Sequence, residues 1–352
     1  MAKKSRTSKV TGSNKKFLPR IYLFFGISIC LIAIYFIGFA QNLNIKSNKY
    51  YLAIPKTYTT ESLIEHLNKN DLIKVSFTFA WTAKVLNLKK IKPGLYTLNK
   101  NWGNLRLISS IENQSPKPYL KHDIKSYRNR SNIVKDLCKK TNLSFIDFYK
   151  ALNDSSFLSR LELTKESVYA LFLPLKTSIP KKTNSYEVIE IIKSNFDEYW
   201  TSSRQDGIAN SKLNPIEATI LSSIVFAETK NINEMPLIAG VYINRLKRGM
   251  RLESDPTLVF AKGDFSMHRI YQKHTQSNSH YNTYRKKGLP PGPIGVLNLS
   301  ALDAVVNYTE HDYIFFCANE DFSGTHVYSE TFFEHKKKAI RYRKALNKKN
   351  IK

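Results

Sequence analysis

The sequence predicts an α+β protein with a single N-terminal transmembrane helix. Three observations predict this class: one uncharged apolar run near the N-terminus, short strand-like segments beside turn residues, and helical patterns that recur to the C-terminus. The chain has 352 residues, of which 42% are apolar and 24% are charged. This composition allows two or three domains and excludes a largely disordered, collagen-like or disulfide-dense protein.

Basic residues far outnumber acidic ones: 55 Lys and Arg against 28 Asp and Glu give a formal net charge of +27. Such an excess indicates an anionic partner, which can be nucleic acid, acidic lipid or an anionic polymer. The chain carries no nucleic-acid recognition motif, so DNA and RNA are not expected partners. Its three cysteines show no metal-type spacing, and a pairing of Cys138 with Cys317 stays open.

The N-terminus has the pattern of a membrane anchor. Residues 1–20 hold seven basic residues and no acidic one, and residues 21–40 carry no charge. Twenty helical residues span roughly 30 Å, the thickness of a bilayer core. The run is long for a signal peptide and Phe39-Ala40-Gln41 is a poor cleavage site, so an anchor is favoured over a cleaved leader. The basic flank predicts a cytoplasmic N-terminus, with the residues after 40 on the other side of the membrane.

Residues 48–112 are expected to form a small α+β module. A strand is predicted at Tyr50–Ile54, helices at 60–69 and 72–88, and a second strand at Leu95–Leu98. The pattern alone equally fits a generic small domain.

Residues 113–213 form an intermediate α+β region in this interpretation. Helical patterns cover 133–138, 145–152 and 186–200, and the polar segment 202–212 is predicted to be a linker.

The next helix brings the first candidate for chemistry. Residues 214–217 (Asn-Pro-Ile-Glu) combine an N-cap, a proline at the first helical position and a glutamate at the third, which predicts a helix through Thr229. Glu228 lies three residues after Val225 and beside the apolar stripe of this helix. A carboxyl there is partly desolvated, which raises its pKa and makes it a candidate general acid. The alternative, which the spacing alone favours, is a helix-end glutamate held in a salt bridge.

Glu217 lies on the same helix face as Glu228, eleven residues earlier. At about 1.5 Å per residue the two carboxyls are roughly 16 Å apart. Glycosidase pairs need about 5 Å or roughly 6.5–9.5 Å. Glu217 is therefore predicted to cap the helix rather than to share a reaction with Glu228.

Several segments after this helix suit a carbohydrate cleft. A helix is predicted at 234–248, and Asp255-Pro256-Thr257 is expected to form a rigid polar turn. The segment Tyr281-Asn282-Thr283-Tyr284 and the Pro/Gly-rich loop 288–295 follow. Aromatic faces stack on sugar rings and amides bind hydroxyls, while a stiff loop lowers the ordering cost. A hairpin-like connection is the alternative.

The last part of the chain predicts a buried strand at 313–316, a turn and strand at 324–329, and a basic terminal helix. Three histidines between 268 and 280 recur every six residues, which matches no helix or strand face, so no metal site is expected. His326 is either catalytic or structural.

From Leu221 to His335 the sequence closely resembles the YceG-like family of endolytic murein transglycosylases. The motifs occur in the family's order and near its spacing, at residues 223–229 (Ser-Ile-Val-Phe-Ala-Glu-Thr), 243–246, 249–257, 281–284, 288–294, 326–331 and 334–335. Residues 50–112 also resemble the LysM-like subdomain of that family. The resemblance divides the chain into a basic cytoplasmic tail (1–20), a transmembrane helix (21–40), a LysM-like subdomain (48–112), the intermediate region (113–213) and a mixed α/β catalytic domain (214–346).

The resemblance implies an enzyme that cleaves bonds between N-acetylmuramic acid and N-acetylglucosamine within glycan strands, without water. It would leave 1,6-anhydromuramyl ends and so terminate strand growth. The family's catalytic glutamate precedes Thr in the motif Val-x-x-Glu-Thr and carries over to Glu228, which would act as acid and then as base. The motifs also carry over substrate-binding or positioning roles to Asp255, Thr257, Tyr281, Asn282, Tyr284 and His326.

No cofactor or metal is expected. The expected partners are peptidoglycan strands and the bilayer around Ile21–Ala40 of a bacterial cytoplasmic membrane, with peptidoglycan synthases as a candidate. Two alternatives keep the same fold: an inactive wall-binding scaffold, and a hydrolase that uses a second carboxylate such as Asp255.

Two departures from the family pattern stand out. Phe226 replaces the first Glu of Val-Glu-Lys-Glu-Thr, which leaves Glu228 as the retained carboxylate. The segment Leu173–Thr177 lacks the family's Asp, which puts the packing between subdomains in doubt.

Overall fold

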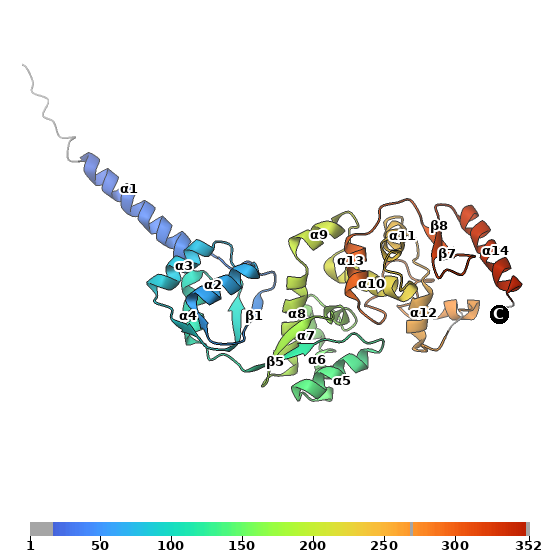
Figure 1. The fold of residues 1–352 in the computed structure, drawn as a ribbon, viewed down its shortest axis with the longest axis horizontal. Helices are drawn as coiled ribbons and strands as arrows, with labels where there is room; N and C mark the ends of the chain where they lie inside the picture. The colour runs from blue at the N-terminus through green and yellow to red at the C-terminus, as the bar shows by residue number, and fades with distance from the viewer. Residues whose placement is uncertain (1–16, 268–269, 350–352) are drawn as a thin grey trace, which may run out of the picture. The chain divides into compact units, whose positions relative to one another are not determined.

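The computed structural model describes residues 17–267 and 270–349, and only the backbone of residues 17–21. The chain forms two compact units, Met1–Pro116 and Lys117–Lys352 (Figure 1). Helices and short antiparallel strands occur in both units, which confirms a mixed α/β protein.

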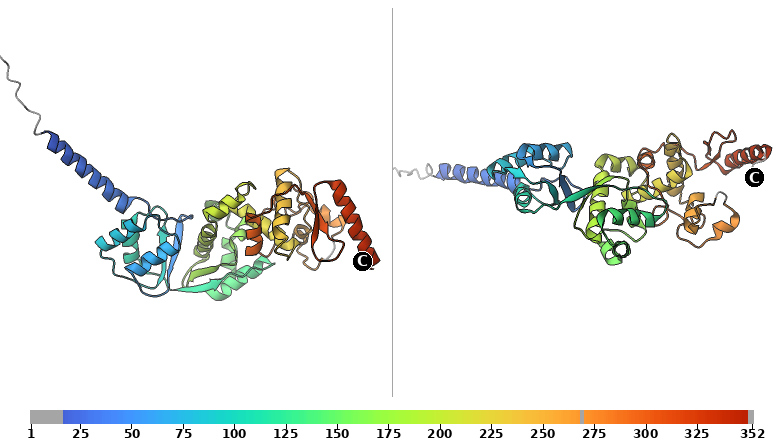
Figure 2. Two further views of the ribbon diagram at one scale, coloured as in Figure 1. Left: turned by 45° about the horizontal axis from the view of Figure 1, so that its top comes forward. Right: turned by 60° about the horizontal axis from the view of Figure 1, so that its bottom comes forward.

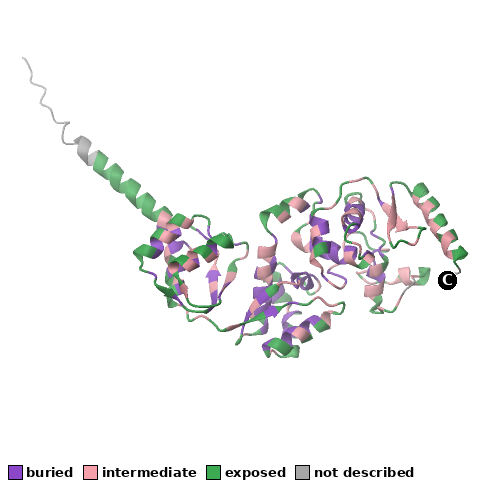
Figure 3. Ribbon diagram, viewed as in Figure 1, coloured by how far each residue is buried: buried purple, intermediate pink, exposed green. Residues whose placement is uncertain are grey.

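One helix among the described residues is long and apolar enough to cross a membrane. Its apolar window is Tyr22–Phe39, which runs through α1 (Phe17–Ile34) and the π-helical turn η1 (Tyr35–Phe39). Its large apolar side chains, such as Phe24, are exposed, as expected for a segment that packs against lipid rather than protein (Figure 3). Residues 1–16 of the predicted basic tail lie outside the described part of the chain.

The rest of the first unit has the predicted order of strand, two helices and strand. Strand β1 (Lys49–Ile54) pairs antiparallel with β4 (Gly94–Asn99) over six residue pairs. The other elements are β2 (Tyr58–Thr59), α2 (Thr60–Lys69), α3 (Ser76–Val85), β3 (Lys90–Ile91) and α4 (Asn104–Asn113). Helix α3 is shorter than the predicted 72–88, because Val75 is extended just before it and Asn87 adopts a left-handed backbone conformation just after it.

The second unit contains two short antiparallel pairs, β5 (Tyr119–Asp123) with β6 (Lys176–Pro180) and β7 (Phe315–Ala318) with β8 (His326–Ser329). Its helices are α5 (Arg130–Thr141), α6 (Phe145–Ala151), α7 (Ser155–Arg160), α8 (Ser185–Tyr199), α9 (Ser202–Ala209), α10 (Pro215–Glu228), α11 (Met235–Lys247), α12 (Asp255–Lys262), α13 (Leu299–Val306) and α14 (Phe332–Lys348), with 3-10 turns η2 (Ser167–Leu171) and η3 (Gln272–Gln276). Helix α14 packs beside β7 and β8 (Figures 1 and 2).

A single hydrophobic core runs through this unit. It joins Val134 and Val188 from the intermediate region to Leu221, Ile238 and Leu302 from the C-terminal region. Helix α10 lies at its centre, buried from residue 218 to residue 225 and packed against α11 and α13. Packing therefore holds the end of α10, which carries the Glu228 carboxyl, in one position.

Three local predictions are wrong. The predicted linker at 202–212 is mostly helix α9, and its Ile208 is 2% exposed because it joins the core. The expected turn at 255–257 is the first turn of α12, with Ser254 as N-cap and Pro256 in a position that suits helix starts. The strand predicted at 313–316 begins at Phe315 and is only partly buried, since it lies in a two-stranded hairpin.

Gly240 in α11 marks a close contact that tolerates no side chain. A Cβ there would collide with the backbone oxygen of Thr309 and lie 2.7 Å from Nε2 of His311. Alanine normally stabilises a helix by about 1 kcal/mol relative to glycine. Because the collision is with backbone, we expect Gly240→Ala instead to lower the free energy of unfolding by about 1–3 kcal/mol, measured by chemical denaturation. Lys247→Ala, an exposed change on the same helix, is the control, and equal stabilities for the two variants would contradict the contact.

Candidate active site

Helix α10 places Glu228 by rules that are local to the sequence. The predicted capping box forms: the Asn214 side chain accepts from the Glu217 N–H at 2.9 Å, and the Glu217 carboxylate accepts from the Asn214 N–H at 2.9 Å. Glu217 is thus engaged at the start of the helix, as predicted. Glu228 is the last residue of α10, because Thr229 is already extended.

The Glu228 carboxyl is partly buried and is bound on one side. Its Oε1 accepts hydrogen bonds from the Tyr242 hydroxyl at 2.6 Å and from the Ser254 hydroxyl at 2.6 Å. Within the described part of the chain, no Lys or Arg forms an ion pair with it and no group donates to Oε2. The salt-bridge interpretation of this glutamate is therefore wrong.

Desolvation raises the pKa of Glu228, and the nearby charge of Asp255 adds to this, while the hydrogen bonds from Ser254 and Tyr242 and the nearby His326 oppose it. Since both donors stabilise negative charge on Oε1, a bound proton resides on Oε2, the free oxygen. The carboxyl is thus arranged to hold a proton and to donate it from a defined atom.

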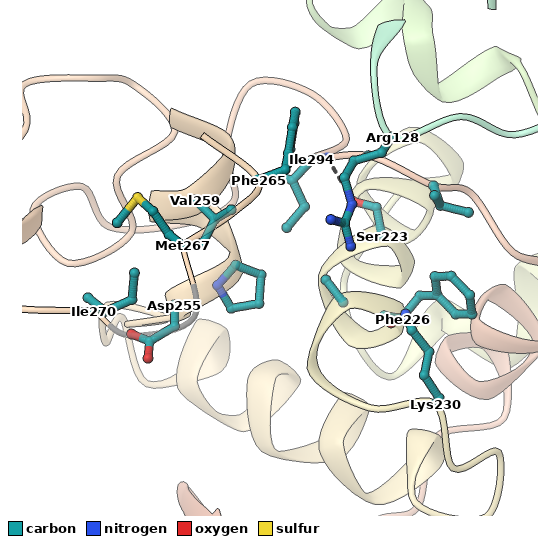
Figure 4. Close-up of a pocket in the computed structure, with 14 residues that line it drawn as sticks. Arg128, Ser223, Phe226, Lys230, Asp255, Val259, Phe265, Met267, Ile270 and Ile294 are labelled. Carbon is teal, nitrogen blue, oxygen red and sulfur yellow. Dashed lines mark hydrogen bonds between the residues drawn. The ribbon is translucent and has the colours of Figure 1, made fainter. Parts of the chain in front are cut away.

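Two cavities lie on either side of Asp255. One, of about 270 Å³, is lined by residues that include Glu228, Tyr242 and Tyr284. The other, of about 340 Å³, is lined by α10, α12 and the loops around Phe265 and Ile294 (Figure 4). Both are lined in part by Asp255, so a polymer that filled both would pass Glu228.

Asp255 and Tyr284 are the predicted site residues that the fold brings to Glu228. Asp255 is exposed at the first position of α12 and accepts a hydrogen bond from the Tyr284 hydroxyl at 2.6 Å. Burial raises the pKa of Tyr284, and the Asp255 carboxylate raises it further, so Tyr284 stays a neutral donor. Both side chains line the Glu228 cavity and can reach a bound ligand.

Thr257 and Asn282 are fully buried, so their side chains position other groups rather than offer a surface. The Thr257 hydroxyl donates to the Ser254 carbonyl oxygen at 2.6 Å and shares a hydrogen bond with Thr283 at 2.8 Å. The Asn282 amide donates to the carbonyl oxygens of Thr275 and Ser277 at 2.9 and 2.6 Å. The Thr257 bonds therefore hold the backbone around Ser254, one of the two donors to Glu228, and the Asn282 bonds hold the loop at 275–282.

Tyr281 and His326 lie at the edges of the site and line neither cavity. The Tyr281 hydroxyl accepts from Arg130 at 2.5 Å and its ring packs against Phe260. His326 donates its backbone N–H to the buried carboxylate of Glu234 at 2.6 Å, and its Nδ1 lies 3.3 Å from the same group. Through Glu234, which also accepts from the Thr229 hydroxyl at 3.2 Å, strand β8 is tied to the end of α10.

Sequence reasoning missed Tyr242 and Ser254, the two donors to Glu228. Ser254 lies inside the quoted motif 249–257, and Tyr242 directly precedes the motif 243–246. A tyrosine on the buried face of a helix needs a hydrogen-bond partner for its hydroxyl, and this signal would have singled out Tyr242.

We expect Tyr242→Phe and Ser254→Ala to raise the pKa of Glu228, and so to move the pH dependence of any reaction in which this carboxyl donates a proton. Each change removes a bond that stabilises the carboxylate, so the pKa of Glu228 rises and its acid form persists to higher pH. The alkaline limb of kcat/KM against pH should shift upward in both variants. Ser254→Thr, which keeps the hydroxyl, is the control, and an unshifted limb in Ser254→Ala would contradict the assignment.

The described residues contain no group of three or more His, Cys, Asp or Glu side chains placed to hold a metal ion. The side chains of Cys30, Cys138 and Cys317 are free thiols.

Comparisons with known proteins show which family the chain belongs to. The model of the YceG-like family matches residues 52–341. An endolytic murein transglycosylase of Bacillus subtilis is 24% identical over 312 residues, which cover 84% of this chain and 85% of the relative. A Streptococcus pneumoniae protein of the same name is 25% identical over 302 residues, which cover 78% of this chain and 55% of the relative.

A crystal structure of a yceG-like protein from Listeria monocytogenes aligns with a TM-score of 0.46 and 23% identity, and covers 82% of this chain and 98% of that one. The family model, for its part, extends over both compact units and includes every residue of the Glu228 site. The resemblance seen in the sequence is thereby confirmed: the chain belongs to the YceG-like family.

Proposed function

We propose that this protein is an endolytic murein transglycosylase, a membrane-anchored enzyme that cleaves peptidoglycan strands internally. One observation carries the proposal: Glu228 is a desolvated carboxyl with a raised pKa, a free oxygen and a cavity in front of it. The names of the relatives in Bacillus subtilis and Streptococcus pneumoniae support the same activity.

The reaction needs one group that gives and then takes a proton. Glu228 would protonate the oxygen of the bond between N-acetylmuramic acid and N-acetylglucosamine from Oε2. The resulting carboxylate, stabilised on Oε1 by Tyr242 and Ser254, would take the proton of the sugar's 6-hydroxyl as that oxygen closes onto the anomeric carbon. The product is a 1,6-anhydromuramyl end, and the carboxyl is protonated again.

The remaining residues fit supporting roles. Asp255 and Tyr284 face the same cavity and are assigned to substrate binding, while Thr257, Asn282, Tyr281 and His326 hold the segments around it. Subtracting the seven basic residues of the tail 1–20 from +27 leaves +20 on the rest of the chain, which suits an acidic wall (27 − 7 = 20). Ile21–Ala40 would hold the chain in the cytoplasmic membrane with the site outside. Residues 48–112 would act as a LysM-like module on glycan. Cleavage beside peptidoglycan synthases would end strand growth.

A hydrolase is the second candidate, because Asp255 lies close enough to Glu228 to raise its pKa. A hydrolase would need that carboxylate, or another, to activate water. The hydrogen bond from Tyr284 to Asp255 favours a binding role instead. An inactive scaffold is disfavoured, since a carboxyl held for proton transfer serves no purpose in binding alone.

The chemical end of the cleavage product distinguishes between these functions. The full chain in detergent should release fragments with 1,6-anhydromuramyl ends from intact glycan strands, identified by mass spectrometry. Reducing ends in place of anhydro ends would establish the hydrolase. Binding without cleavage, both alone and with a synthase present, would establish the scaffold.

A further inference from the structure

The 340 Å³ cavity beside the site has two cations on one wall (Figure 4). Arg128 comes from the connection between β5 and α5, and Lys230 comes from the residues after α10. They lie about a hundred positions apart in the sequence, and the fold brings both to one cavity. Neither forms an ion pair with a residue in the described part of the chain.

Both cations contact aromatic rings. The Lys230 ammonium lies 3.5 Å from the centre of the Phe226 ring and donates to the Phe226 carbonyl oxygen. The Arg128 guanidinium lies 5.4 Å from the centre of the Phe265 ring. Such contacts orient a cation without neutralising it. Both residues are exposed, so the cavity wall carries two positive charges that a ligand can reach.

The cations also interact unfavourably with each other. Desolvation lowers the pKa of Lys230, and the charge of Arg128 lowers it further. The acid on the cavity wall, Asp255, already accepts a hydrogen bond from Tyr284. Two like charges beside one cavity are stabilised when an anion binds between them.

We propose that this cavity binds a carboxylate carried by the muramic acid unit of the strand, next to the bond that Glu228 cleaves. This inference rests on the proposed function and adds a specificity-determining pair to it. The carboxylate has two sources: the 3-O-lactyl group of a stripped strand, or a peptide attached to that group. The same cavity is lined by the apolar side chains of Val259, Phe265 and Ile270, which suit the methyl groups and aliphatic parts of either source.

Binding of this carboxylate would also involve the intermediate region. Arg128 lies in the segment 113–213, outside the motifs quoted for the catalytic part. That segment shares its hydrophobic core with α10, so its position relative to Glu228 is fixed by packing. It would therefore contribute directly to substrate recognition.

A substrate-by-variant cycle tests the pair. The variants are the full chain, Arg128→Gln, Lys230→Gln and the double variant. The substrates are strands with peptides, strands stripped to free lactyl carboxylates, and stripped strands whose carboxylates are converted to methylamides. A double change of Lys139→Gln and Arg160→Gln, two exposed cations on α5 and α7 that line no cavity described above, controls for net charge.

We expect each single change to lower kcat/KM on carboxylate-bearing strands by about tenfold, as for a lost hydrogen bond to a charged group. On methylamide strands the kcat/KM of the wild type should fall to that of the double variant. The kcat/KM of the variants should differ little between methylamide and carboxylate-bearing strands. If the variants lower kcat/KM on stripped strands, the bound group is the lactyl carboxylate. If they lower it only on peptide-bearing strands, the bound group is a carboxylate of the peptide. Equal losses on charged and neutral strands, or equal losses in the control, would overturn the proposal.

Measurements of strand affinity test this inference separately from the proposed activity. The affinity of the same strands is measured in a Glu228→Gln background, where cleavage does not interfere. If the wild type cleaves no strand but the affinity cycle shows the coupling, the cavity assignment stands and the transglycosylase proposal fails. If the wild type cleaves strands but neither kcat/KM nor affinity shows coupling between the two cations and the strand carboxylate, only the cavity assignment fails.

Discussion

Glu228→Gln should strongly reduce strand cleavage while the protein stays folded and binds glycan. The amide keeps the shape of the carboxyl, and its oxygen can still accept from Tyr242 and Ser254 at the Oε1 position. It cannot supply or take the proton, and general acid–base catalysis contributes roughly 10²–10⁴-fold. We therefore expect kcat to fall at least about a hundredfold with little change in the affinity for glycan.

The stability of the same variant relative to the wild type should increase as the pH rises. The folded-state pKa of Glu228 is raised, so the contribution of this group to stability is complete below its unfolded pKa and is lost as pH rises through the folded pKa. Glutamine does not titrate. The Tm of Glu228→Gln relative to the wild type should thus be higher at pH 8 than at pH 4, measured by calorimetry.

Glu217→Gln is the matched control, since it removes the same charge from the same helix. Glutamine can still serve in a capping box, so this variant should keep both cleavage and most of its stability. Wild-type cleavage by Glu228→Gln, or equal loss in both variants, would show that the proton donor is another residue.

The parts of the fold that were predicted correctly depend on local rules. The apolar run at 21–40 and the capping box at 214–217 each carry their signal within a few residues. The first strand–helix–helix–strand module also follows from local turns and periodicity. Where two local rules compete, the prediction failed: Asp255-Pro256-Thr257 suits a turn and a helix start equally, and contacts with Thr283 decide for the helix.

The site required contacts that no local pattern contains. Glu228 could be placed beside an apolar stripe, but its two donors come from α11 and from the N-cap of α12. Ile208 gives α9 a buried anchor, although its neighbours are polar enough to predict a linker. Arg128 lies in a basic loop that has no distinguishing pattern of its own. The donors to Glu228, the burial of Ile208 and the position of Arg128 all depend on long-range packing, which a local sequence pattern does not reveal.

Arg245→Met should both unfold the protein more easily and reduce cleavage. Arg245 is 7% exposed, and its guanidinium donates to the carbonyl oxygens of Ile314 at 2.7 Å and Leu252 at 2.8 Å. It therefore joins the residue before β7 to the segment that carries Ser254. Methionine fills the space but leaves both oxygens without a donor. Each buried, unsatisfied group costs about 1–3 kcal/mol. We expect the free energy of unfolding to fall by about 3 kcal/mol or more, measured by urea denaturation.

Arg248→Met, at the C-cap of the same helix, separates this effect from loss of charge. Arg248 is exposed, and a surface change of this kind alters stability by about 0.5 kcal/mol or less. Arg245→Lys should be intermediate, because a lysine keeps the charge but lacks the planar set of donors. If Arg245→Met and Arg248→Met were equally stable, the Arg245 guanidinium would not hold the two segments together. The position of Ser254, and with it the pKa of Glu228, would then depend on Thr257 and Thr283 alone.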